Sequence, residues 1–528
     1  MNAFERLDSI ADKDTFVPYE DDIDDGRVIA DDEYRAKIQR NRDRYGLYEA
    51  VLTGTADING HRTAIGVMDA RFLRASMGYY VGEKITRLFE HATKDRLPVI
   101  IFCASGGARV QEGITSLLQM QKTSQACAGH AREGLLYISV LTDPTYGGVM
   151  ASFATLADII IAEENAHIGF TGERVIRQTT GETLPEGFQT AQFHKEHGFA
   201  DEVVSEDNMK AYLSVVLEAF DGKATSAAVD KAPEGDKVSE TDKKPEADKV
   251  PETDKALETD KASETDSPRG SWDNVKLARK ITRPTALEYM NELFDRFTEL
   301  HGDRISGDDP AVVGGIGFFR GRPVMTIGNQ KGKKNVQEAI RRNWGMASPS
   351  GLHKAVRLMK LAEKFSLPVV FFVDTMGAAC GKNAEEMGQA GVISETLAAA
   401  SWLKTLTLSV IVGEAGSGGA LVFAIANEVW MLEHAVYSVI TPEGYASIIW
   451  KNSERKKEAA DAMGMCASSL HGQQVADRII PESEPVTAES LGEICSRLSV
   501  ELEDFFAGYS HMTAGEIVEE RYERYRRF

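Results

Sequence analysis

Two pairs of adjacent glycines are the residues of this sequence whose type and spacing point most directly to chemistry. Gly147 and Gly148 lie in LTDPTYGGVMAS, and Gly418 and Gly419 lie in IVGEAGSGGALV. Each pair follows a short apolar run and precedes a small-residue run that favours a helix. At such a junction the first N–H groups of the helix have no intrahelical acceptor, and glycine lets a ligand approach them closely. The pairs therefore predict backbone sites for negatively charged oxygen.

The sequence patterns of the commoner glycine-rich sites are missing from the chain. It contains no GxxxxGK[ST] phosphate loop, and neither pair belongs to a GxGxxG turn with the acidic residue that dinucleotide binding requires. Ser417 lies in AGSGG, which is one glycine short of the GxSxG nucleophile elbow. The eleven histidines include no HExxH pair. We therefore interpret His167, His194 and His434 as structural or surface residues and predict no metal site.

Backbone amides can stabilise an anion that forms during a reaction, such as the enolate of a thioester, without a side-chain nucleophile. For one glycine pair alone, tight packing of a helix on a sheet is an equally simple interpretation. However, the device recurs. The run LPVIIFCASGGARVQEG begins 50 residues before Gly147, and LPVVFFVDTMGAACGKNAEEMG begins 51 residues before Gly418. This matched separation favours two similar domains, each with a chemical role for its glycine turn.

The elements that must position these turns are short strands alternating with helices. At 528 residues the chain is too long for one hydrophobic core. Continuous apolar runs at 98–102, 136–141, 368–373 and 408–412 are typical of parallel strands buried on both faces. Apolar residues recur at helical spacing over 352–364. Both halves are therefore predicted to be α/β domains.

The two halves are separated by a repetitive charged segment. Within it, DKVSETDKKPEADKVPETDKALETDKASETDS repeats an Asp-Lys pair every six residues, a period that fits neither a helical stripe nor strand alternation. So few large apolar residues cannot offset the entropy of ordering the chain. The sequence therefore predicts a first domain over 1–222, a disordered linker over 223–270 and a second domain over 271–528.

Composition excludes several function classes. The net charge of −21 disfavours nucleic acid and anionic membranes as partners. No apolar run is long enough to span a membrane, and the first residues, MNAFERLDSIADKD, do not resemble a secretory leader, so we expect a cytoplasmic protein. The five cysteines are an odd number and include no CxxC pair, which is typical of reduced, buried thiols.

The residues around the glycines resemble those of one known family. The first half resembles the β subunit of bacterial acetyl-CoA carboxylase carboxyltransferase through ASGGARVQEG, ISVLTDPTYGGVMASFA and AHIGFTGERVIRQT. The second half resembles the α subunit of the same enzyme through RPTALEYMNELFDRFTELHGDR, GEAGSGGALVFAIANEVWML and YSVITPEGYASIIWK. The resemblance covers about residues 30–220 and 275–485. It is specific because several long motifs occur in family order.

This resemblance implies an α/β protein of two crotonase-like domains (ClpP/crotonase superfamily), joined here by the repetitive linker, with an active site between a β-type and an α-type domain. The implied enzyme moves a carboxyl group from carboxybiotin to acetyl-CoA, giving malonyl-CoA for fatty acid synthesis. The chain has no biotinyl Met-Lys-Met motif, so no covalently bound cofactor is expected. Biotin would come on a separate biotin carboxyl carrier protein, with biotin carboxylase as a further partner. A homo-oligomer, a dimer or larger, is also implied.

The resemblance assigns roles to particular residues. It places Gly147 and Gly148 in one oxyanion hole and Gly418 and Gly419 in the other. One hole would bind the thioester enolate and the other the ureido oxygen of biotin, and the sequence leaves open which pair serves which. Loops 74–78 and 105–109 are candidates for binding CoA. The predicted substrate-binding residues, on the CoA or the biotin side, are Ser76, Met77, Gly78, Ser105, Gly106, Gly107, Arg109, Gly377 and Ala378. For Arg109 an ion pair with Glu112 is the alternative to a phosphate contact.

The sequence also departs from the family pattern. The usual α-type loop DTPGAYPG is DTMGAACG here, at 374–381, and the loss of two prolines loosens it. The four-cysteine zinc ribbon that usually begins the β subunit has no counterpart, so no zinc is expected. Three other functions stay open. They are transfer to another acyl-CoA such as propionyl-CoA, a biotin-dependent decarboxylase component, and a non-catalytic scaffold of the carboxylase complex.

Overall fold

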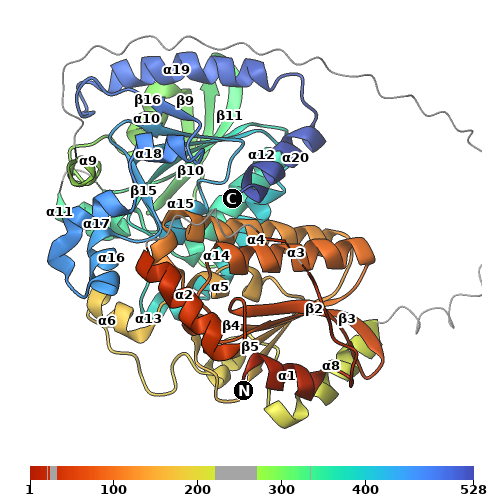
Figure 1. Cartoon of the computed structure of the whole chain (residues 1–528). Coiled ribbons are helices and arrows are strands. Elements are labelled where there is room, and N and C mark those ends of the chain that lie inside the picture. The colour runs from red at the N-terminus through yellow and green to blue at the C-terminus, as the bar shows by residue number, and fades with distance from the viewer. Residues whose placement is uncertain (21, 24–31, 221–269, 333–334) are drawn as a thin grey trace, which may run out of the picture.

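The computed structural model describes residues 1–20, 22–23, 32–220, 270–332 and 335–528 (Figure 1). The predicted linker, 223–270, lies outside the described residues except for Gly270, which precedes the first helix of the second half. The described part forms two sets of elements, each built around one eight-stranded sheet. Figure 1 shows the sheet of the first half at the bottom and that of the second half at the top, with helices of both halves between them.

The first sheet has the order β1-β2-β3-β4-β5-β6-β8, and β7 pairs with β5. Strands β3 to β6 and β8 run parallel, whereas β1 and β2 are antiparallel additions at one edge. The strands are β1 (Val17–Pro18), β2 (Val51–Ile58), β3 (His61–Met68), β4 (Val99–Gly106), β5 (Tyr137–Tyr146), β6 (Ile159–Glu163), β7 (Ile168–Gly169) and β8 (Glu202–Val204). The helices are α1 (Ala3–Ile10), α2 (Asp32–Tyr45), α3 (Tyr79–Asp95), α4 (Ile114–Arg132), α5 (Gly147–Met150), α6 (Glu173–Thr180), α7 (Ala191–Glu196) and α8 (Glu206–Phe220).

The second sheet repeats this plan in the order β16-β14-β13-β12-β11-β10-β9, and β15 pairs with β13. Its strands are β9 (Asp295–Glu299), β10 (Val312–Phe319), β11 (Arg322–Asn329), β12 (Val369–Thr375), β13 (Thr407–Gly416), β14 (Glu428–Leu432), β15 (Val436–Ser438) and β16 (Arg478–Ile480). The helices are α9 (Ser271–Ala278), α10 (Ala286–Leu293), α11 (Val336–Arg341), α12 (Pro349–Lys364), α13 (Lys382–Glu386), α14 (Gln389–Ser401), α15 (Ser417–Leu421), α16 (Pro442–Ile449), α17 (Lys456–Ala462), α18 (Ala467–Gly472), α19 (Leu491–Gly508) and α20 (Ala514–Arg526).

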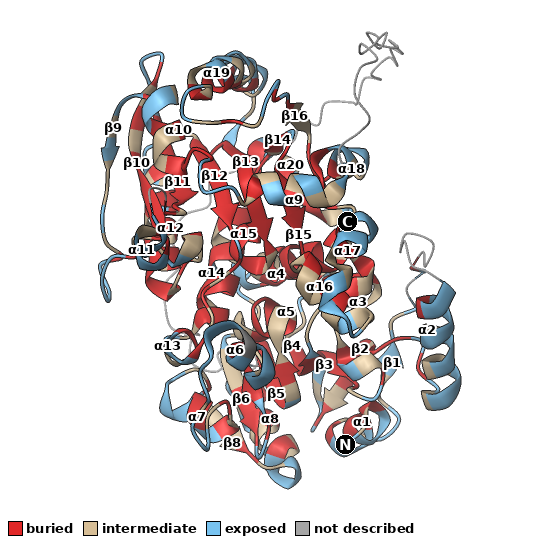
Figure 2. Ribbon diagram, turned by 90° about the vertical axis from the view of Figure 1, so that its left-hand side faces the viewer, coloured by how far each residue is buried: buried red, intermediate tan, exposed pale blue. Residues whose placement is uncertain are grey.

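The strand register shows that the two halves are copies of one plan. Val99 pairs with Tyr137 in the first half, and the residues 270 positions further on, Val369 and Thr407, pair in the second. The four strands predicted from apolar runs are confirmed as β4, β5, β12 and β13, and the predicted helix is the C-terminal part of α12. These strands are almost wholly buried, as Figure 2 shows, because helices cover both faces of each sheet.

Local sequence explains where several helices begin. Pro349 stands at the first turn of α12, where its missing N–H is no loss. Thr285 and Glu288 form a reciprocal capping box at α10, and Thr513 and Glu516 form one at α20. The described helices include none long and apolar enough to cross a membrane. All five cysteines are free thiols, of which only Cys380 is not fully buried.

The two halves contact each other through buried polar groups as well as apolar ones. The carboxylate of Glu385 on α13 accepts hydrogen bonds from the first half, from the amides of Phe170 and Thr171 at 3.0 and 2.7 Å and from Gln189 Nε2 at 2.9 Å. Burial raises the pKa of Glu385 even though these donors favour its charged form. A buried carboxylate that depends on donors from the other half ties the two domains together.

His194 on α7 gives this contact region a pH dependence. Its imidazole is buried, and Nε2 lies 2.9 Å from the carbonyl oxygen of Ile168. Burial lowers the pKa of His194 from 6.5 to about 4. The folded protein therefore keeps this ring neutral, whereas the unfolded chain takes up a proton below pH 6.5. The stability that depends on the neutral ring is present above that pH and is lost as the pH falls toward 4.

We expect His194→Gln, which keeps a side-chain N–H donor but cannot titrate, to flatten this dependence. Urea denaturation of both proteins between pH 4 and 8 provides the measurement. The difference in unfolding free energy between wild type and variant should shift in favour of the variant as the pH falls below about 6.5. A difference that does not change with pH would show that the ring protonates freely in the folded state.

Candidate functional site: two turns with free backbone amides

The first glycine turn lies where β5 ends and α5 begins. Gly147 adopts a φ of +66°, a left-handed conformation that favours glycine, and its amide donates to the carbonyl oxygen of Phe170 at 3.0 Å. The next amide, that of Gly148, donates to no protein acceptor within the described residues. A Cβ atom on Gly147 would lie 2.9 Å from Gly107 Cα, so this turn and the loop after β4 are in contact.

The loop after β4 supplies a second free amide. The Gly107 amide donates to Ser105 Oγ at 3.0 Å, and Arg109 N donates to the Met77 carbonyl oxygen at 2.8 Å. Between them, the amide of Ala108 donates to no acceptor in the described part of the chain. Ala108 and Gly148 each follow directly after the residues in contact, Gly107 and Gly147. Their two N–H groups are therefore the best candidates for the donors of an oxyanion hole.

The second half builds the same turn with one difference. At the position equivalent to Gly147 stands Ser417, with a φ of +52°. Gly418 is equivalent to Gly148, and Ala378 is equivalent to Ala108. Thr375 holds the amide of Gly377 as Ser105 holds that of Gly107. In this half too, the amides of Ala378 and Gly418 donate to no protein acceptor among the residues described.

Gly419, the second glycine of the predicted pair, has a packing role. It is equivalent to Val149, and a Cβ atom on it would lie 2.1 Å from Gly377 C and 2.2 Å from Ala378 N. Only glycine lets α15 approach the loop after β12 this closely. The structure thus brings each predicted glycine pair to its predicted loop. The equivalent positions, however, are Gly147 with Ser417 and Gly148 with Gly418, one residue away from the match that the glycines suggest.

One side chain links the two turns. Met120, near the middle of α4, is 4% exposed. Its Cγ would lie 3.3 Å from a Cβ atom on Gly148, and its Cε would lie 3.4 Å from one on Gly418. The starts of α5 and α15 therefore pack on the same methionine, one from each half of the chain. Nothing in the sequence around Met120 marks this position.

The other predicted substrate-binding residues divide into two groups. The loop of Ser105, Gly106 and Gly107 contacts the first turn, and Met77 Cε would lie 3.4 Å from a Cβ atom on Gly148, although Ser105 and Met77 are 0% exposed. Ser76 is half-buried, and its hydroxyl donates to the Leu73 carbonyl oxygen. Gly78 and Arg109 are buried beside carboxylates. Gly78 precedes α3, and a Cβ atom on it would lie 2.4 Å from the Glu112 carboxylate, which accepts from the amide of Tyr79. This carboxylate occupies the positive N-terminus of α3.

Arg109 takes the ion-pair alternative. Its guanidinium is 1% exposed and binds both carboxylate oxygens of Glu49, at 2.5 and 2.6 Å. Glu112 Oε1 lies 3.9 Å from Arg109 Nη1. Burial alone would lower the pKa of Arg109, but the charge of Glu49 raises it above its usual value. The Arg109 guanidinium is thus buried and paired, chiefly with Glu49 rather than with the expected Glu112, which argues against a contact with phosphate.

A strained turn places a different side chain at each site. Leu73, Arg74 and Ala75 have φ values of +48°, +58° and +49°, and the equivalent residues in the second half, Asn343, Trp344 and Gly345, have φ values of +44°, +54° and +77°. Non-glycine residues in this region are strained, and such strain gathers at functional sites. The turn presents an exposed arginine in one half and a half-buried tryptophan in the other.

Arg74 lies against the first glycine turn. A Cβ atom on Gly106 would be 2.8 Å from its Nε. The guanidinium pairs with no carboxylate among the described residues. It lines an open cavity of about 470 Å³ with Ala70, Asp143, Pro144, Tyr146 and His167. Arg74 is in one of the predicted CoA loops, whereas nothing in the sequence singled out Trp344.

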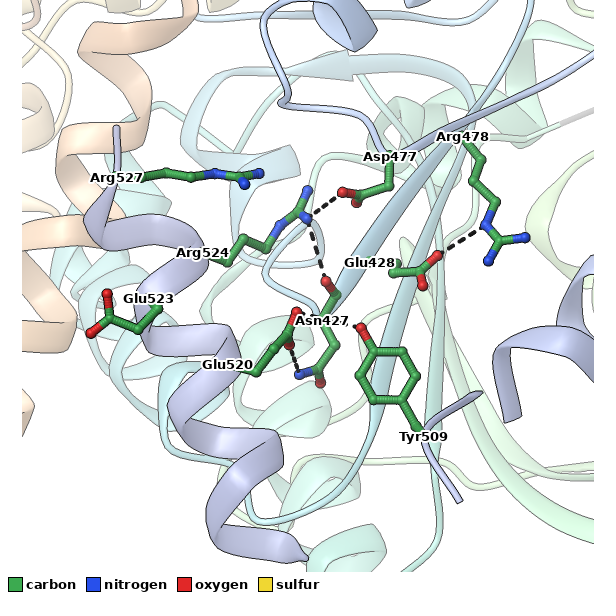
Figure 3. Close-up of a pocket in the computed structure, with 9 residues that line it drawn as sticks. All are labelled: Asn427, Glu428, Asp477, Arg478, Tyr509, Glu520, Glu523, Arg524 and Arg527. Carbon is green, nitrogen blue, oxygen red and sulfur yellow. Dashed lines mark hydrogen bonds and ion pairs between the residues drawn. The ribbon is translucent and has the colours of Figure 1, made fainter. Parts of the chain in front are cut away.

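Another cavity lies beside α20, away from the two turns. It measures about 550 Å³, and Figure 3 shows its polar lining, which consists of Asn427, Glu428, Asp477, Arg478, Tyr509, Glu520, Glu523, Arg524 and Arg527. Arg524 pairs with Asp477 at 2.6 Å, and Arg478 pairs with Glu428 at 3.1 Å. Its main charges are satisfied within the protein, and it is lined by none of the residues of the two turns. No group of three or more possible metal ligands occurs among the described residues.

The contrast between Gly418 and Gly419 can be tested by substitution. Gly419→Ala should lower the free energy of unfolding by about 1–3 kcal/mol, because its Cβ atom overlaps backbone that must move. Gly418→Ala lies in the same helix and meets only the flexible end of Met120, so it should stay near wild type or gain up to about 1 kcal/mol from helix propensity. Urea denaturation of both variants measures the difference. Equal stabilities would contradict the packing role of Gly419.

Comparisons with known proteins show which family this chain resembles. The family model for acetyl co-enzyme A carboxylase carboxyltransferase-like proteins matches residues 226–528. The acetyl-coenzyme A carboxylase carboxyl transferase subunits beta/alpha of Natranaerobius thermophilus is 44% identical over 526 residues, covering 100% of this chain and 86% of that protein. The corresponding protein of Clostridium tetani is 40% identical, with coverage of 100% and 87%.

Two further comparisons cover one half of the chain or its general shape. The subunit alpha of Clostridium acetobutylicum is 47% identical over 255 residues, which cover 48% of this chain and 93% of that protein. A transcarboxylase 12S structure covers 95% of this chain and 90% of its own, with 21% identity and a TM-score of 0.35, too low for a comparison element by element. Because full-length relatives carry both halves in the same order, this chain belongs to the acetyl-CoA carboxylase carboxyltransferase family, with β and α subunits joined in one chain.

Proposed function

We propose that this biotin-dependent carboxyltransferase moves the carboxyl group of carboxybiotin to acetyl-CoA, with one substrate anion held at each turn. The observation that supports the proposal is the repeated pair of free amides, Ala108 with Gly148 and Ala378 with Gly418, packed on the two ends of Met120. A reaction with two anionic species in sequence needs two such sites close together.

The chemistry can be written with these amides alone. Carboxybiotin releases carbon dioxide and leaves the ureido anion of biotin, which removes a proton from the methyl group of acetyl-CoA. The resulting enolate attacks the carbon dioxide and forms malonyl-CoA. Each anion carries its charge on an oxygen that two preorganised N–H groups can bind, and the loss of one such donor reduces turnover about 100- to 1000-fold in comparable sites.

The turns at 73–75 and 343–345 support an assignment of substrates to halves. Arg74 offers an exposed cation beside Gly106, with no carboxylate partner in the described part of the chain, which suits the phosphates of CoA. Trp344 offers an aromatic surface at the equivalent place, which suits the uncharged ring system of biotin. We therefore assign the thioester to Ala108 and Gly148 and the ureido oxygen to Ala378 and Gly418.

Several partners belong to the same proposal. Biotin arrives on a separate carrier protein and is recharged by a biotin carboxylase, while the chain itself binds no cofactor covalently and no zinc. The acidic net charge of −21 supports a protein of the cytoplasm that binds neither nucleic acid nor membrane. A homo-oligomer is proposed from the family alone.

The reverse half-reaction tests the function. Purified chain incubated with malonyl-CoA and biocytin should release acetyl-CoA, followed through a coupled assay, while methylmalonyl-CoA tests for a propionyl-type acceptor in parallel. Preference for malonyl-CoA supports the proposal, and preference for methylmalonyl-CoA would replace it with the alternative acyl-CoA. A folded protein that binds CoA but stays silent, with biocytin and with a biotinylated carrier, would favour a scaffold.

The assignment of halves predicts a reciprocal pair of kinetic effects. Arg74→Ala should raise KM for malonyl-CoA about tenfold and leave KM for biocytin unchanged, since one charge-assisted hydrogen bond to phosphate is worth about 1.5–3 kcal/mol. Trp344→Ala should raise KM for biocytin and leave KM for malonyl-CoA unchanged. Steady-state kinetics with each substrate varied in turn distinguishes the two. If each variant affects the other substrate instead, the assignment is reversed.

A further inference from the structure

Helix α4 of the first half is buried all round although its middle is polar. Gln119, Gln121 and Lys122 are 0% exposed, like Thr123 to Gln125 after them. Their partners come largely from the second half. Gln121 Nε2 donates to Ser401 Oγ at 2.7 Å, and Gln125 accepts from Trp402 Nε1 at 3.1 Å through its carbonyl oxygen. The same helix carries Met120, so whatever holds α4 also sets the distance between the two glycine turns.

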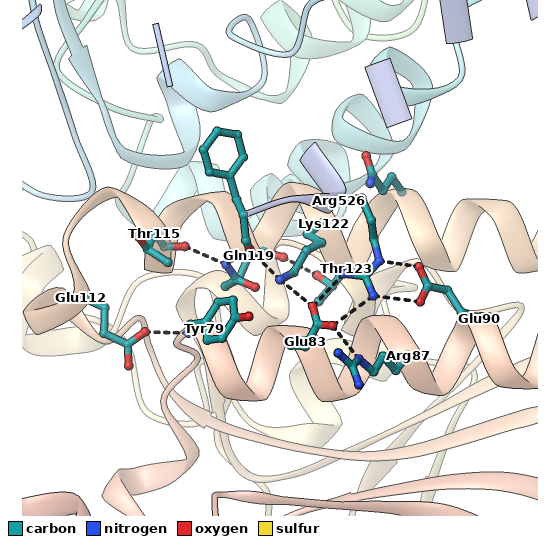
Figure 4. Close-up of polar contacts among 12 residues, drawn as sticks. Tyr79, Glu83, Arg87, Glu90, Glu112, Thr115, Gln119, Lys122, Thr123 and Arg526 are labelled. Carbon is teal, nitrogen blue, oxygen red and sulfur yellow. Dashed lines mark hydrogen bonds and ion pairs between the residues drawn. The ribbon is translucent and has the colours of Figure 1, made fainter. Parts of the chain in front are cut away.

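The end of α20 grips α3 next to α4. Arg526 binds both oxygens of Glu83, at 2.8 and 3.0 Å, and both oxygens of Glu90, at 2.6 and 3.1 Å (Figure 4). These carboxylates stand on one face of α3, more than 400 residues before Arg526 in the chain. Tyr522, one turn earlier on α20, also donates to Glu90, at 3.2 Å. A planar guanidinium that spans two carboxylates fixes orientation as well as distance.

Lys122 carries this contact into α4. Its Nζ lies 3.0 Å from Glu83 Oε2 and 2.6 Å from the carbonyl oxygen of Phe528, which Gln119 Nε2 also contacts at 3.1 Å. Arg87 Nε completes the set of cations around Glu83 at 2.6 Å. Burial alone would raise the pKa of Glu83, but Lys122 and Arg526 lower it to about 2. Glu83 is therefore the charged centre where α3, α4 and α20 meet.

We propose that Arg526 is a positioning residue for carboxyl transfer, which holds α4 in register so that Met120 keeps the Gly148 and Gly418 turns at their working separation. Buried ion pairs are weak sources of net stability, because the desolvation of the charges offsets their attraction, whereas they can specify one arrangement over others. This cluster lies on the side of α4 that faces α20 and touches neither turn. The cluster therefore affects the reaction through the position of α4. This inference rests on the proposed function.

The fold tolerates the substitution that tests this proposal. Arg526 is 23% exposed, and without it Glu83 keeps Lys122 and Arg87 while Glu90 is 34% exposed to solvent. Arg526→Ala therefore leaves no buried charge unpaired. Arg527→Ala is the matched control, because the neighbouring guanidinium donates to the Gln474 carbonyl oxygen at 2.9 Å and lies 5.1 Å from the centre of the Phe528 ring, both within the second half. Arg526→Lys keeps the positive charge but loses the planar guanidinium that binds two carboxylates at once.

The experiment measures the reverse half-reaction of the full chain with malonyl-CoA and biocytin. The rate is divided by the concentration of CoA-binding sites, determined separately for each variant. Arg526→Ala should lower kcat at least tenfold with both KM values within twofold of wild type, since misplacement of reacting groups by about 1 Å can reduce rates a hundredfold. Arg526→Lys should be intermediate and Arg527→Ala unchanged. The proposal would be overturned if kcat of Arg526→Ala were unchanged. It would also be overturned if the rate fell only in proportion to the number of CoA-binding sites.

Hydrogen exchange separates this inference from the function itself. In Arg526→Ala the amides of α4 should exchange at least tenfold faster than in wild type, while those of β4 and β5 keep their rates and Arg527→Ala shows no change. This readout needs no activity. If α4 exchanges faster in Arg526→Ala and the wild-type chain is inactive, the proposed reaction is refuted but the positioning of α4 by Arg526 is kept. Unaltered exchange of α4 would refute the positioning role whatever the activity.

Discussion

The burial of α4 between two domains is the constraint on which the rest of the structure depends. A helix whose central residues include three glutamines, a lysine, a threonine and a serine is costly to bury unless its polar groups find partners. Neither half alone supplies the partners that α4 has. Ser401, Trp402, Tyr522 and Phe528 of the second half contribute several of them, while Gln119 Oε1, Gln121 Oε1 and Ser124 Oγ have no partner among the described residues. Docking of the halves therefore supplies much of the hydrogen bonding of α4, and it brings Met120 into contact with both turns.

The two glycine turns offer backbone amides rather than side chains. Amides at the start of a short helix are fixed by the strand before them and by the loop beside them, so they need no side chain to reach into the site. Ser105 and Thr375 each hold the following loop by the same pair of bonds to the residue two positions on. The proposed chemistry thus depends on how accurately two strands and one helix are placed, which a helix shared by both halves and buried along its middle provides.

Sequence reasoning predicted what local pattern encodes. The apolar strands followed from continuous runs of Val, Ile, Leu and Phe, and the turns followed from their glycines. The glycines alone match Gly147 with Gly418, which is one residue away from the structural match of Gly147 with Ser417. Ser417 adopts the left-handed conformation that usually indicates glycine, so the sequence pattern misses it. The burial of Arg109 was out of reach, since its partner Glu49 lies 60 residues earlier. The role of Met120 could not be predicted either, because its contact with Gly418 joins the two halves and no pattern in the sequence of α4 indicates it.

Duplication followed by divergence accounts for the asymmetry of the site. The strand register, the strained turns at 73–75 and 343–345 and the free amides are common to both halves. The halves differ in the side chains and in the exposure around these turns. Arg74 and Trp344 occupy one position with opposite chemistry, and Gly148 is half-buried whereas Gly418 is buried. In the proposed function, two copies of one anion-binding turn accept two unlike substrates, because the backbone that would stabilise charge is kept while the side chains around it change. A strained turn that persists in both copies, with non-glycine residues in left-handed conformations, indicates that the direction in which it presents residues 74 and 344 outweighs its conformational cost.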